Sequence, residues 1–317
     1  MSAHYEHLLS FCLSHPWAVE PQMLATIARV LGQRIAGHRM RAEDLSAAIA
    51  SRRALPQPAA GAVAVIPMYG VLAPRANLLT ETSGMTSYDV LAAQVREMVK
   101  TDSIKTIVLD VDSPGGSVAG ATELVREIIA ARAKKPIVAV AQYTMASAAY
   151  WVASAATEIV AAPSAQIGSI GVFTIHEDLS KALEAEGITR TYITAGKYKV
   201  DSNETQPLAG DAKARLQRMC DDSLALFHAD IAKGRGVAID KVRADFGEGA
   251  VLSASEALSA GMVDRIATLD ETVRRVSTGS WSRGAAAAVS EPALVEGVPD
   301  RLRRAREVEH ALLEMNL

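Results

Sequence analysis

The sequence predicts an α/β protein in which helices flank a mostly parallel sheet. Short β-branched runs alternate with amphipathic helical segments from about residue 62 to residue 233, and repeated strand–helix–strand units imply right-handed crossovers between parallel strands. Aromatic residues make up only 4% of the 317 residues. The core must therefore consist of small aliphatic side chains, which suit helices that lie close to a buried sheet.

Each element of this layered domain has its own signal. Apolar runs rich in valine and isoleucine predict strands at 62–66, 68–72, 105–111, 136–141, 158–161, 167–174 and 190–194. Apolar residues at helical spacing predict helices near 86–98, 124–129, from 146, at 179–186 and at 211–233. Thr86–Asp89 gives the first of these a capping-box-like start, and Gly234-Arg-Gly236 ends the last.

The chain divides at two places. Residues 1–60 are expected to be a helical segment followed by a linker, because Pro56 and Pro58 disfavour helix after residue 50. Residues 61–270 form the α/β domain. Residues 271–317 contain, from Ser277 to Ala288, a run rich in serine, glycine and alanine that is typical of a flexible tail, and they are expected to end in a charged helix from 300 to 317.

Composition excludes several classes of protein. The formal net charge is −3, so the basic excess that a nucleic-acid-binding protein normally carries is missing. Cys12 and Cys220 are too few for a disulfide framework or a zinc cluster, and we expect two reduced thiols. No export signal is evident, and the apolar stretch 146–156 is too short to span a bilayer. We therefore expect a cytoplasmic protein without a membrane anchor.

Two loops at strand ends carry candidate chemistry. In Asp112–Ser117, the adjacent Gly115 and Gly116 let backbone amides approach a ligand and stabilise a developing oxyanion, although a simple tight turn fits the loop equally well. Ser147 stands at the start of a helix of small apolar residues. A serine there is commonly an N-cap, but the helix dipole would also favour the negative charge of an attacking alkoxide.

A third loop, Thr194–Asp201, carries Lys197 and Lys199. Two lysines on a glycine-containing loop usually form a solvated surface. A lysine can act as a general base only where desolvation keeps it largely neutral near pH 7. A catalytic role for this loop therefore requires that one of its two lysines be buried.

Five motifs in order make the chain resemble the signal peptide peptidase A family, serine peptidase family forty-nine. The resemblance covers roughly Val63 to Ile266 and rests on segments 112–118, 145–150, 167–172, 196–199 and 253–264. It implies the Clp protease/crotonase-like superhelix of ββα units. It also implies a serine endopeptidase that needs no metal or organic cofactor.

The resemblance also implies roles for single residues. Ser147 corresponds to the nucleophile and Lys199 to the general base, while the Gly115-Gly116 turn would supply the oxyanion hole, mainly through Gly116. Ser169 resembles the accessory serine that orients the lysine amine. Lys197 would be an exposed neighbour of the base.

The chain departs from the family in two respects. Ala148 and Ala149 follow the nucleophile where glycines are usual, which narrows the pocket without removing a catalytic group. A helical segment also stands where cellular members carry a transmembrane anchor. This arrangement is similar to the head-maturation proteases of tailed phages and prophages. It implies a capsid or scaffold protein as polypeptide substrate, action within a prohead, and a homo-oligomer.

Four alternatives remain open at this stage. His176 follows a strand downstream of the serine and could complete a Ser147–His176–Asp triad. The chain could be a cytoplasmic signal-peptide-peptidase-like protease that degrades peptides. A crotonase would use the same glycine amides to bind acyl-CoA thioesters without Ser147. Finally, the chain could be an assembly protein with a vestigial peptidase core.

Overall fold

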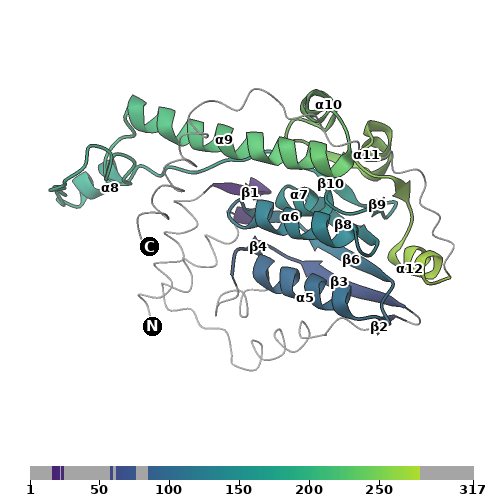
Figure 1. The fold of residues 1–317 in the computed structure, drawn as a ribbon. Helices are drawn as coiled ribbons and strands as arrows, with labels where there is room; N and C mark the ends of the chain where they lie inside the picture. Colours follow the sequence, from purple (N-terminus) through teal and green to yellow (C-terminus); the bar gives the residue numbers. More distant parts are fainter. Residues whose placement is uncertain (1–15, 22, 25–57, 60–61, 76–84, 279–317) are drawn as a thin grey trace, which may run out of the picture. The chain divides into compact units, whose positions relative to one another are not determined.

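A mostly parallel sheet lies at the centre of the chain (Figure 1). The computed structural model describes residues 16–21, 23–24, 58–59, 62–75 and 85–278. Along the sheet the strands run β11-β10-β8-β6-β3-β2, and β9 pairs with β8 and β12. Their bounds are β2 Pro58–Ala59, β3 Val63–Tyr69, β6 Thr106–Ser113, β8 Ile137–Ala146, β9 Glu158–Ala161, β10 Gln166–Gly168, β11 Val251–Ser253 and β12 Arg265–Ile266.

The pairing directions confirm the predicted fold class. The pairs β3–β6, β6–β8, β8–β9, β8–β10 and β9–β12 are parallel, whereas β2–β3 and β10–β11 are antiparallel. In a parallel sheet the carboxyl ends of neighbouring strands meet at one edge, where open α/β sheets place their sites. Ser113 and Ala146, the last residues of β6 and β8, both lie at this edge, just before Gly115 and Ser147.

A second, smaller sheet is built from the segments that follow the main strands. It runs β1 (Trp17–Val19), β7 (Gly115–Ser117), β4 (Leu72–Ala73) and β5 (Thr86–Ser87). Strand β4 follows β3 and precedes helix α5 (Tyr88–Lys100), while β7 follows β6 and precedes α6 (Ala121–Arg132). Successive strand–strand–helix units are therefore present, as expected for a superhelix of ββα units.

Helices cover both faces of the main sheet. One face packs against α5, α6 and α7 (Ala148–Ala153) through small aliphatic residues, and the other, lined with valines such as Val108 and Val138, packs against α12 (Leu269–Ser277). The remaining helices are α8 (Ser180–Ala185), α9 (Gly210–Arg235), α10 (Ile239–Asp245) and α11 (Ala254–Ala260). The limits 61 and 270 of the domain remain a proposal.

Most elements begin and end close to their predicted positions. Helix α5 is capped one residue after the cap expected at Thr86: the Ser87 hydroxyl accepts a hydrogen bond from the Val90 amide at 3.4 Å. Helix α9 ends at Gly236 in the left-handed conformation. No helix in the described ranges combines the length and the apolar content that crossing a membrane requires.

Four predictions of secondary structure are wrong. One strand, β3, spans Val63–Tyr69 where two were expected at 62–66 and 68–72. Residues 190–194 form no strand: they lie exposed, with Ile193 99% accessible, and no neighbouring strand pairs with them. Strand β10 ends at Gly168 instead of continuing to 174, because Ser169 adopts a left-handed backbone with φ 52°. Trp17–Val19 is a strand on β7 within the segment expected to be helical. The helices expected elsewhere in residues 1–60, and the tail beyond 278, lie outside the described residues.

Candidate active site

Ser147 occupies the turn between β8 and α7. Its φ of 54° lies in a region that residues other than glycine seldom adopt. The turn is held by the Ser147 amide, which donates to the Gly168 carbonyl at 2.6 Å, and by the Ser147 carbonyl, which accepts from the Trp151 amide at 2.9 Å. The Ser147 side chain makes no capping hydrogen bond to α7. The N-cap interpretation therefore fails, and the strained turn is of the kind found at functional sites.

The glycine turn lies directly against Ser147. A Cβ at Gly115 would collide with the Ala18 carbonyl oxygen and would lie 2.9 Å from the Ser147 Cβ. Gly115 also has φ +104°, so only glycine fits this position. Its amide donates to the Ser113 hydroxyl at 3.2 Å, and that hydroxyl donates to the Gly70 carbonyl at 2.6 Å. These two hydrogen bonds hold the Gly115-Gly116 turn next to Ser147.

Gly116 is equally constrained from the other side. A Cβ there would collide with the Leu72 carbonyl oxygen and lie 2.6 Å from both the Leu72 carbonyl carbon and nitrogen. Strand β4 therefore approaches β7 as closely as backbone allows. Gly115 and Gly116, the residues predicted for the oxyanion hole, thus lie between β4 and Ser147.

The Ala148 amide belongs to the same site, although the sequence analysis missed it. Ala148 is the first residue of α7, and the first amides of a helix have no intrahelical acceptor. Its nitrogen lies 3.0 Å from the point that a Gly115 Cβ would occupy. The Ala148 amide is a backbone group, so no side chain in the sequence reveals it. Its position directly after Ser147, at the start of a helix, is the feature from which it could be predicted.

Ser169 lies beside Ser147 on the neighbouring strand. Ala146 pairs with Gly168 across β8 and β10, so the two serines are the next residues along each strand. Ser169 has φ 52°, and its amide donates to the Ala250 carbonyl at 2.7 Å. The Ser147 hydroxyl donates to the Gly171 carbonyl at a long 3.5 Å. Ser147, Ser169, Gly115 and Gly116 are thus brought together.

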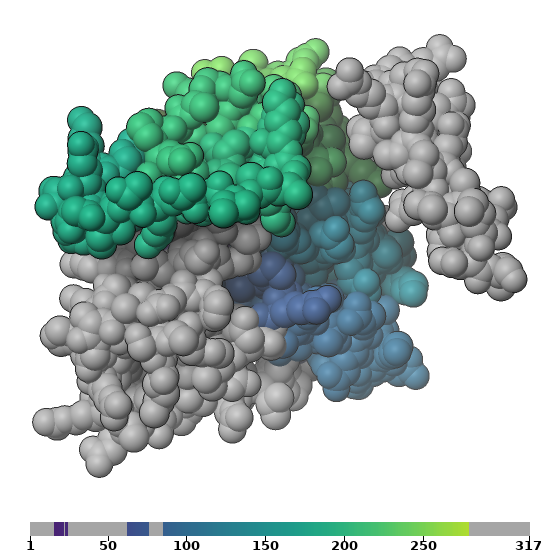
Figure 2. All heavy atoms as spheres, turned by 90° about the vertical axis from the view of Figure 1, so that its left-hand side faces the viewer, coloured from purple at the N-terminus to yellow at the C-terminus, as the bar shows by residue number. Residues whose placement is uncertain are grey.

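Lys199 is not brought to Ser147 within one chain. Ser147 is 1% exposed, whereas Lys199 is exposed on a loop held against the first half of α9. The Arg215 guanidinium lies 4.0 Å from the centre of the Tyr198 ring and also pairs with Asp201. Figure 2 shows the teal and green atoms of this part of the chain at the surface.

The length of α9 shows how far the loop that carries Lys199 lies from helix α7. Phe227 stacks on Trp151 of α7, with ring centres 4.2 Å apart. Arg215, which holds the lysine loop, precedes Phe227 by about 18 Å along the helix axis at 1.5 Å per residue. A single lysine side chain does not span that distance.

His176 is half-buried downstream of β10. Its Nε2 atom is buried without a hydrogen-bond partner among the described residues. No described hydrogen bond joins it to Ser147, whose hydroxyl points to Gly171. The Ser147–His176–Asp triad therefore has a candidate imidazole, but no described hydrogen bond connects that imidazole to Ser147.

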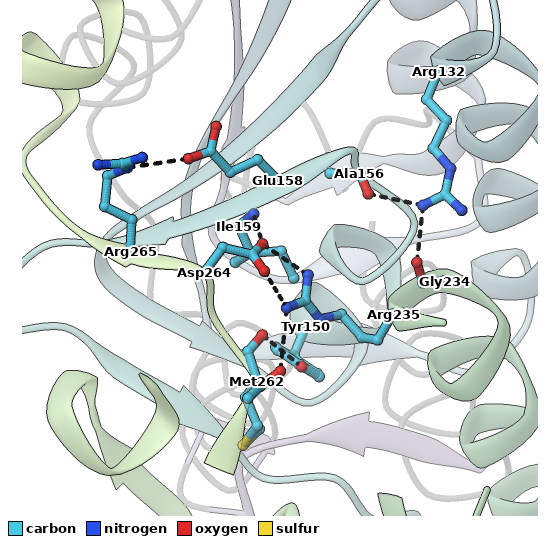
Figure 3. Close-up of polar contacts among 11 residues, drawn as sticks. Arg132, Tyr150, Ala156, Glu158, Ile159, Gly234, Arg235, Met262, Asp264 and Arg265 are labelled. Carbon is cyan, nitrogen blue, oxygen red and sulfur yellow. Dashed lines mark hydrogen bonds and ion pairs between the residues drawn. The ribbon is translucent and has the colours of Figure 1, made fainter. Parts of the chain in front are cut away.

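Residues 253–264, the last motif of the family resemblance, hold helix α7 in place after Ser147 (Figure 3). The buried Tyr150 of α7 donates its hydroxyl to the Met262 carbonyl at 2.9 Å, and burial raises the pKa of that phenol. Asp264 accepts two hydrogen bonds from Arg235 at 2.6 and 2.8 Å and one from the Ile159 amide at 2.7 Å. The motif therefore links α7, α9 and β9.

Charge and burial oppose each other at Arg235. Burial is the largest single influence and lowers the pKa of its guanidinium, but the hydrogen bonds to Asp264 and the electrostatic effects of Tyr150 and Asp264 together outweigh it, so the net pKa is raised. Arg132 adds a second link, because it donates to the carbonyls of Ala156 at 2.8 Å and Gly234 at 2.9 Å (Figure 3). Helix α7, which begins directly after Ser147, is thus held in place by contacts from several sides.

Cys220 of α9 is a free thiol whose pKa is raised mainly by burial, and Cys12 lies outside the described residues. Within the described ranges, no three His, Cys, Asp or Glu side chains are grouped so as to hold a metal ion.

With this geometry in view, comparison with known proteins identifies the family. Residues 129–283, which include Ser147, Ser169 and Lys199, match the family described as Peptidase family S49. This part of the chain belongs to peptidase family S49. The Gly115-Gly116 turn precedes the matched S49 region, but it packs directly on Ser147 inside that region.

Three curated relatives share this similarity. Capsid assembly protease C of Escherichia phage lambda is 30% identical over 84% of this chain and 64% of that protein. Head-tail preconnector protein GP5 of Enterobacteria phage P21 is 31% identical over 68% of this chain and 43% of that protein. Protease 4 of Salmonella typhi is 32% identical over 62% of this chain and 32% of that protein. The chain therefore spans less than two thirds of the length of each of these relatives.

Proposed function

We propose that the chain is a serine endopeptidase whose nucleophile is Ser147. The observation that carries this proposal is the strained turn at Ser147, whose side chain is free of any capping role and faces the Gly115-Gly116 turn. The Gly116 and Ala148 amides are the candidate donors to a tetrahedral oxyanion. Membership of the S49 family supports the same chemistry.

We propose Lys199 as the general base, supplied by a second copy of the chain. In one chain Lys199 is exposed and distant from Ser147, but a lysine base must be desolvated to lose its proton near neutral pH. The segment around it exposes large apolar side chains, with Ile188 47%, Ile193 99% and Tyr198 52% accessible. Such a patch is typical of a protein–protein contact. Docking it over the Ser147 site of a neighbour would bury Lys199 and complete the dyad in a homo-oligomer.

The proposed reaction follows from these positions. Neutral Lys199 takes the hydroxyl proton as the Ser147 oxygen attacks the peptide carbonyl, and the amides hold the resulting oxyanion. The protonated lysine gives its proton to the leaving amine, and water then hydrolyses the ester on Ser147. Ser169, beside Ser147, would accept or donate a hydrogen bond to orient the incoming amine.

Mixing two inactive variants tests the shared dyad. Ser147→Ala and Lys199→Ala should each be inactive alone, and their mixture should regain activity, because a mixed pair contains one intact site. Lys197→Ala is the matched control and should stay active. Activity of Lys199→Ala alone would refute the base, and a mixture that stays inactive while the oligomer forms would refute its supply by a second copy.

We propose capsid or scaffold proteins as the substrate, cleaved within a prohead. This rests on the phage relatives, whose names are those of a capsid assembly protease and a head-tail preconnector protein. Wild-type protein and Ser147→Ala should be incubated with candidate capsid and scaffold chains and analysed by intact mass. Cleavage by the wild type alone supports the proposal, and cleavage by both or by neither contradicts it.

A second candidate keeps the peptidase chemistry but uses His176 as base. The buried, unpartnered Nε2 of His176 favours it. His176→Ala should abolish activity in that case, and Lys199→Ala should not. If peptides rather than capsid chains are cleaved, the cytoplasmic signal-peptide-peptidase-like role, which degrades peptides, becomes the better assignment.

A further inference from the structure

An N-terminal strand of this chain lies along the glycine turn of the candidate active site. Strand β1 pairs antiparallel with β7, with Ala18 opposite Gly116. The Glu20 amide donates to the Pro114 carbonyl at 3.0 Å, and the Val118 amide donates to the Pro16 carbonyl at 3.4 Å. Hydrogen-bonded pairs alternate along such a ladder, so the Ala18–Gly116 pair between them is also a hydrogen-bonding position.

The opposite edge of the same strand is also paired. The Trp17 amide donates to the Phe173 carbonyl at 2.9 Å, and the Phe173 amide donates back to the Trp17 carbonyl at 3.0 Å. Phe173 lies two residues after Gly171, whose carbonyl accepts from the Ser147 hydroxyl. Strand β1 therefore fills the space between two segments that both contact Ser147.

The carbonyl of Ala18 faces the nucleophile. Three atoms surround the position that a Cβ on Gly115 would occupy. They are the Ala18 carbonyl oxygen, the Ser147 Cβ at 2.9 Å and the Ala148 nitrogen at 3.0 Å. A peptide carbonyl thus lies among the groups assigned to the nucleophile and the oxyanion hole. The side chains around it are enclosed, since Trp17, Ala18 and Val19 are at most 2% exposed.

An extended peptide binds a protein edge by adding a strand, which requires unpaired amides and carbonyls on that edge. Here residues 16–20 use those groups on β7 and on Phe173. We propose that residues 16–20 are an internal pseudo-substrate strand, which occupies the polypeptide cleft and is displaced when a substrate strand takes over its hydrogen bonds. This rests on the proposed peptidase function. A substrate that replaces this strand would place a small residue opposite Ser147, as Ala18 is placed, and a large apolar residue just before it, as Trp17 is placed.

Hydrogen exchange of the wild-type full chain tests this without any variant. A displaceable strand opens locally, so the amides of Trp17, Glu20, Val118 and Phe173 should exchange together and at least about tenfold faster than the central-strand amide of Ile107, which opens only on global unfolding. Exchange of all five at one common rate would show that β1 is a fixed part of the core and would overturn the proposal.

Labelling of Ser147 by a small fluorophosphonate provides the second test. A site that is open only part of the time reacts in proportion to its open fraction, so Trp17→Ala should be labelled about tenfold faster than wild type. Tyr143→Ala, which removes an aromatic side chain that is 64% exposed, is the control and should leave the rate unchanged.

The outcomes separate this proposal from the proposed function. Labelling of Ser147 at equal rates in wild type and folded Trp17→Ala would overturn the pseudo-substrate strand and leave the nucleophile standing. Labelling of neither protein would count against the nucleophile, while the exchange experiment would still decide whether β1 detaches. If Trp17→Ala fails to fold, β1 is part of the core and the proposal is overturned.

Discussion

Replacing Gly116 by alanine tests whether the glycine turn is catalytic. The new methyl carbon would stand 2.6 Å from the Leu72 carbonyl carbon and nitrogen, whereas carbon atoms pack best at about 3.5 Å or more. Because the neighbours are backbone atoms, β4 and β7 must move apart by about 1 Å. The amide proposed for the oxyanion hole moves with β7.

The size of the effect follows from that displacement. Overpacking of this kind costs about 1–3 kcal/mol of folding free energy, which a domain of this size can tolerate while staying folded. A shift of about 1 Å in the reacting groups costs on the order of a hundredfold in rate. Activity should therefore fall far more than stability.

Two measurements separate these effects. Urea unfolding gives the stability change, and the rate of Ser147 labelling by a fluorophosphonate gives the chemical change. Gly210→Ala is the matched control, because a Cβ at Gly210 meets nothing within 4 Å and alanine in a helix stabilises by up to about 1 kcal/mol. A folded Gly116→Ala protein labelled at the wild-type rate would refute the oxyanion role of this turn.

Three further predictions concern stability and are checked by urea unfolding. Tyr150→Phe leaves the buried Met262 carbonyl without its 2.9 Å donor and should cost about 1–3 kcal/mol, whereas Tyr143→Phe at an exposed site should change stability by less than about 0.5 kcal/mol; equal effects would contradict the anchoring role of residues 253–264. Burial raises the pKa of the Asp110 carboxyl above its ordinary 3.8, so the protonated carboxyl contributes folding stability that is fully present below pH 3.8 and is lost as pH rises through the raised pKa. Wild type should therefore lose stability relative to Asp110→Asn over that rise in pH, and parallel pH profiles of the two proteins would contradict this. Ser253→Ala removes the capping box of α11 and should cost about 1 kcal/mol; an unchanged unfolding midpoint would show that the cap contributes nothing.

The sequence predicted the central strands well because their signal is local. Strand β9 coincides with the predicted 158–161, since a short buried run there is preceded by the polar Thr157 and followed closely by Pro163. The strands β1, β7 and β11 were not predicted, because three residues carry too little periodicity and their pairing depends on distant partners.

The candidate site was predicted in part for a comparable reason. Ser147 and Gly115 come together because parallel strands place their carboxyl ends at one edge. The place of Lys199 depends instead on the exposed segment before α9, where the expected strand at 190–194 does not form. The Ala148 amide has no side-chain signature, so the structure alone reveals it.

The most direct test of the Ser147–Lys199 assignment is mass-spectrometric mapping of the fluorophosphonate adduct on the assembled wild-type protein and its variants. The Ser147–Lys199 assignment predicts a single adduct on Ser147 that is lost in Ser147→Ala, strongly reduced in Lys199→Ala and retained in Lys197→Ala. An adduct on another residue, or undiminished labelling of Lys199→Ala, would contradict it.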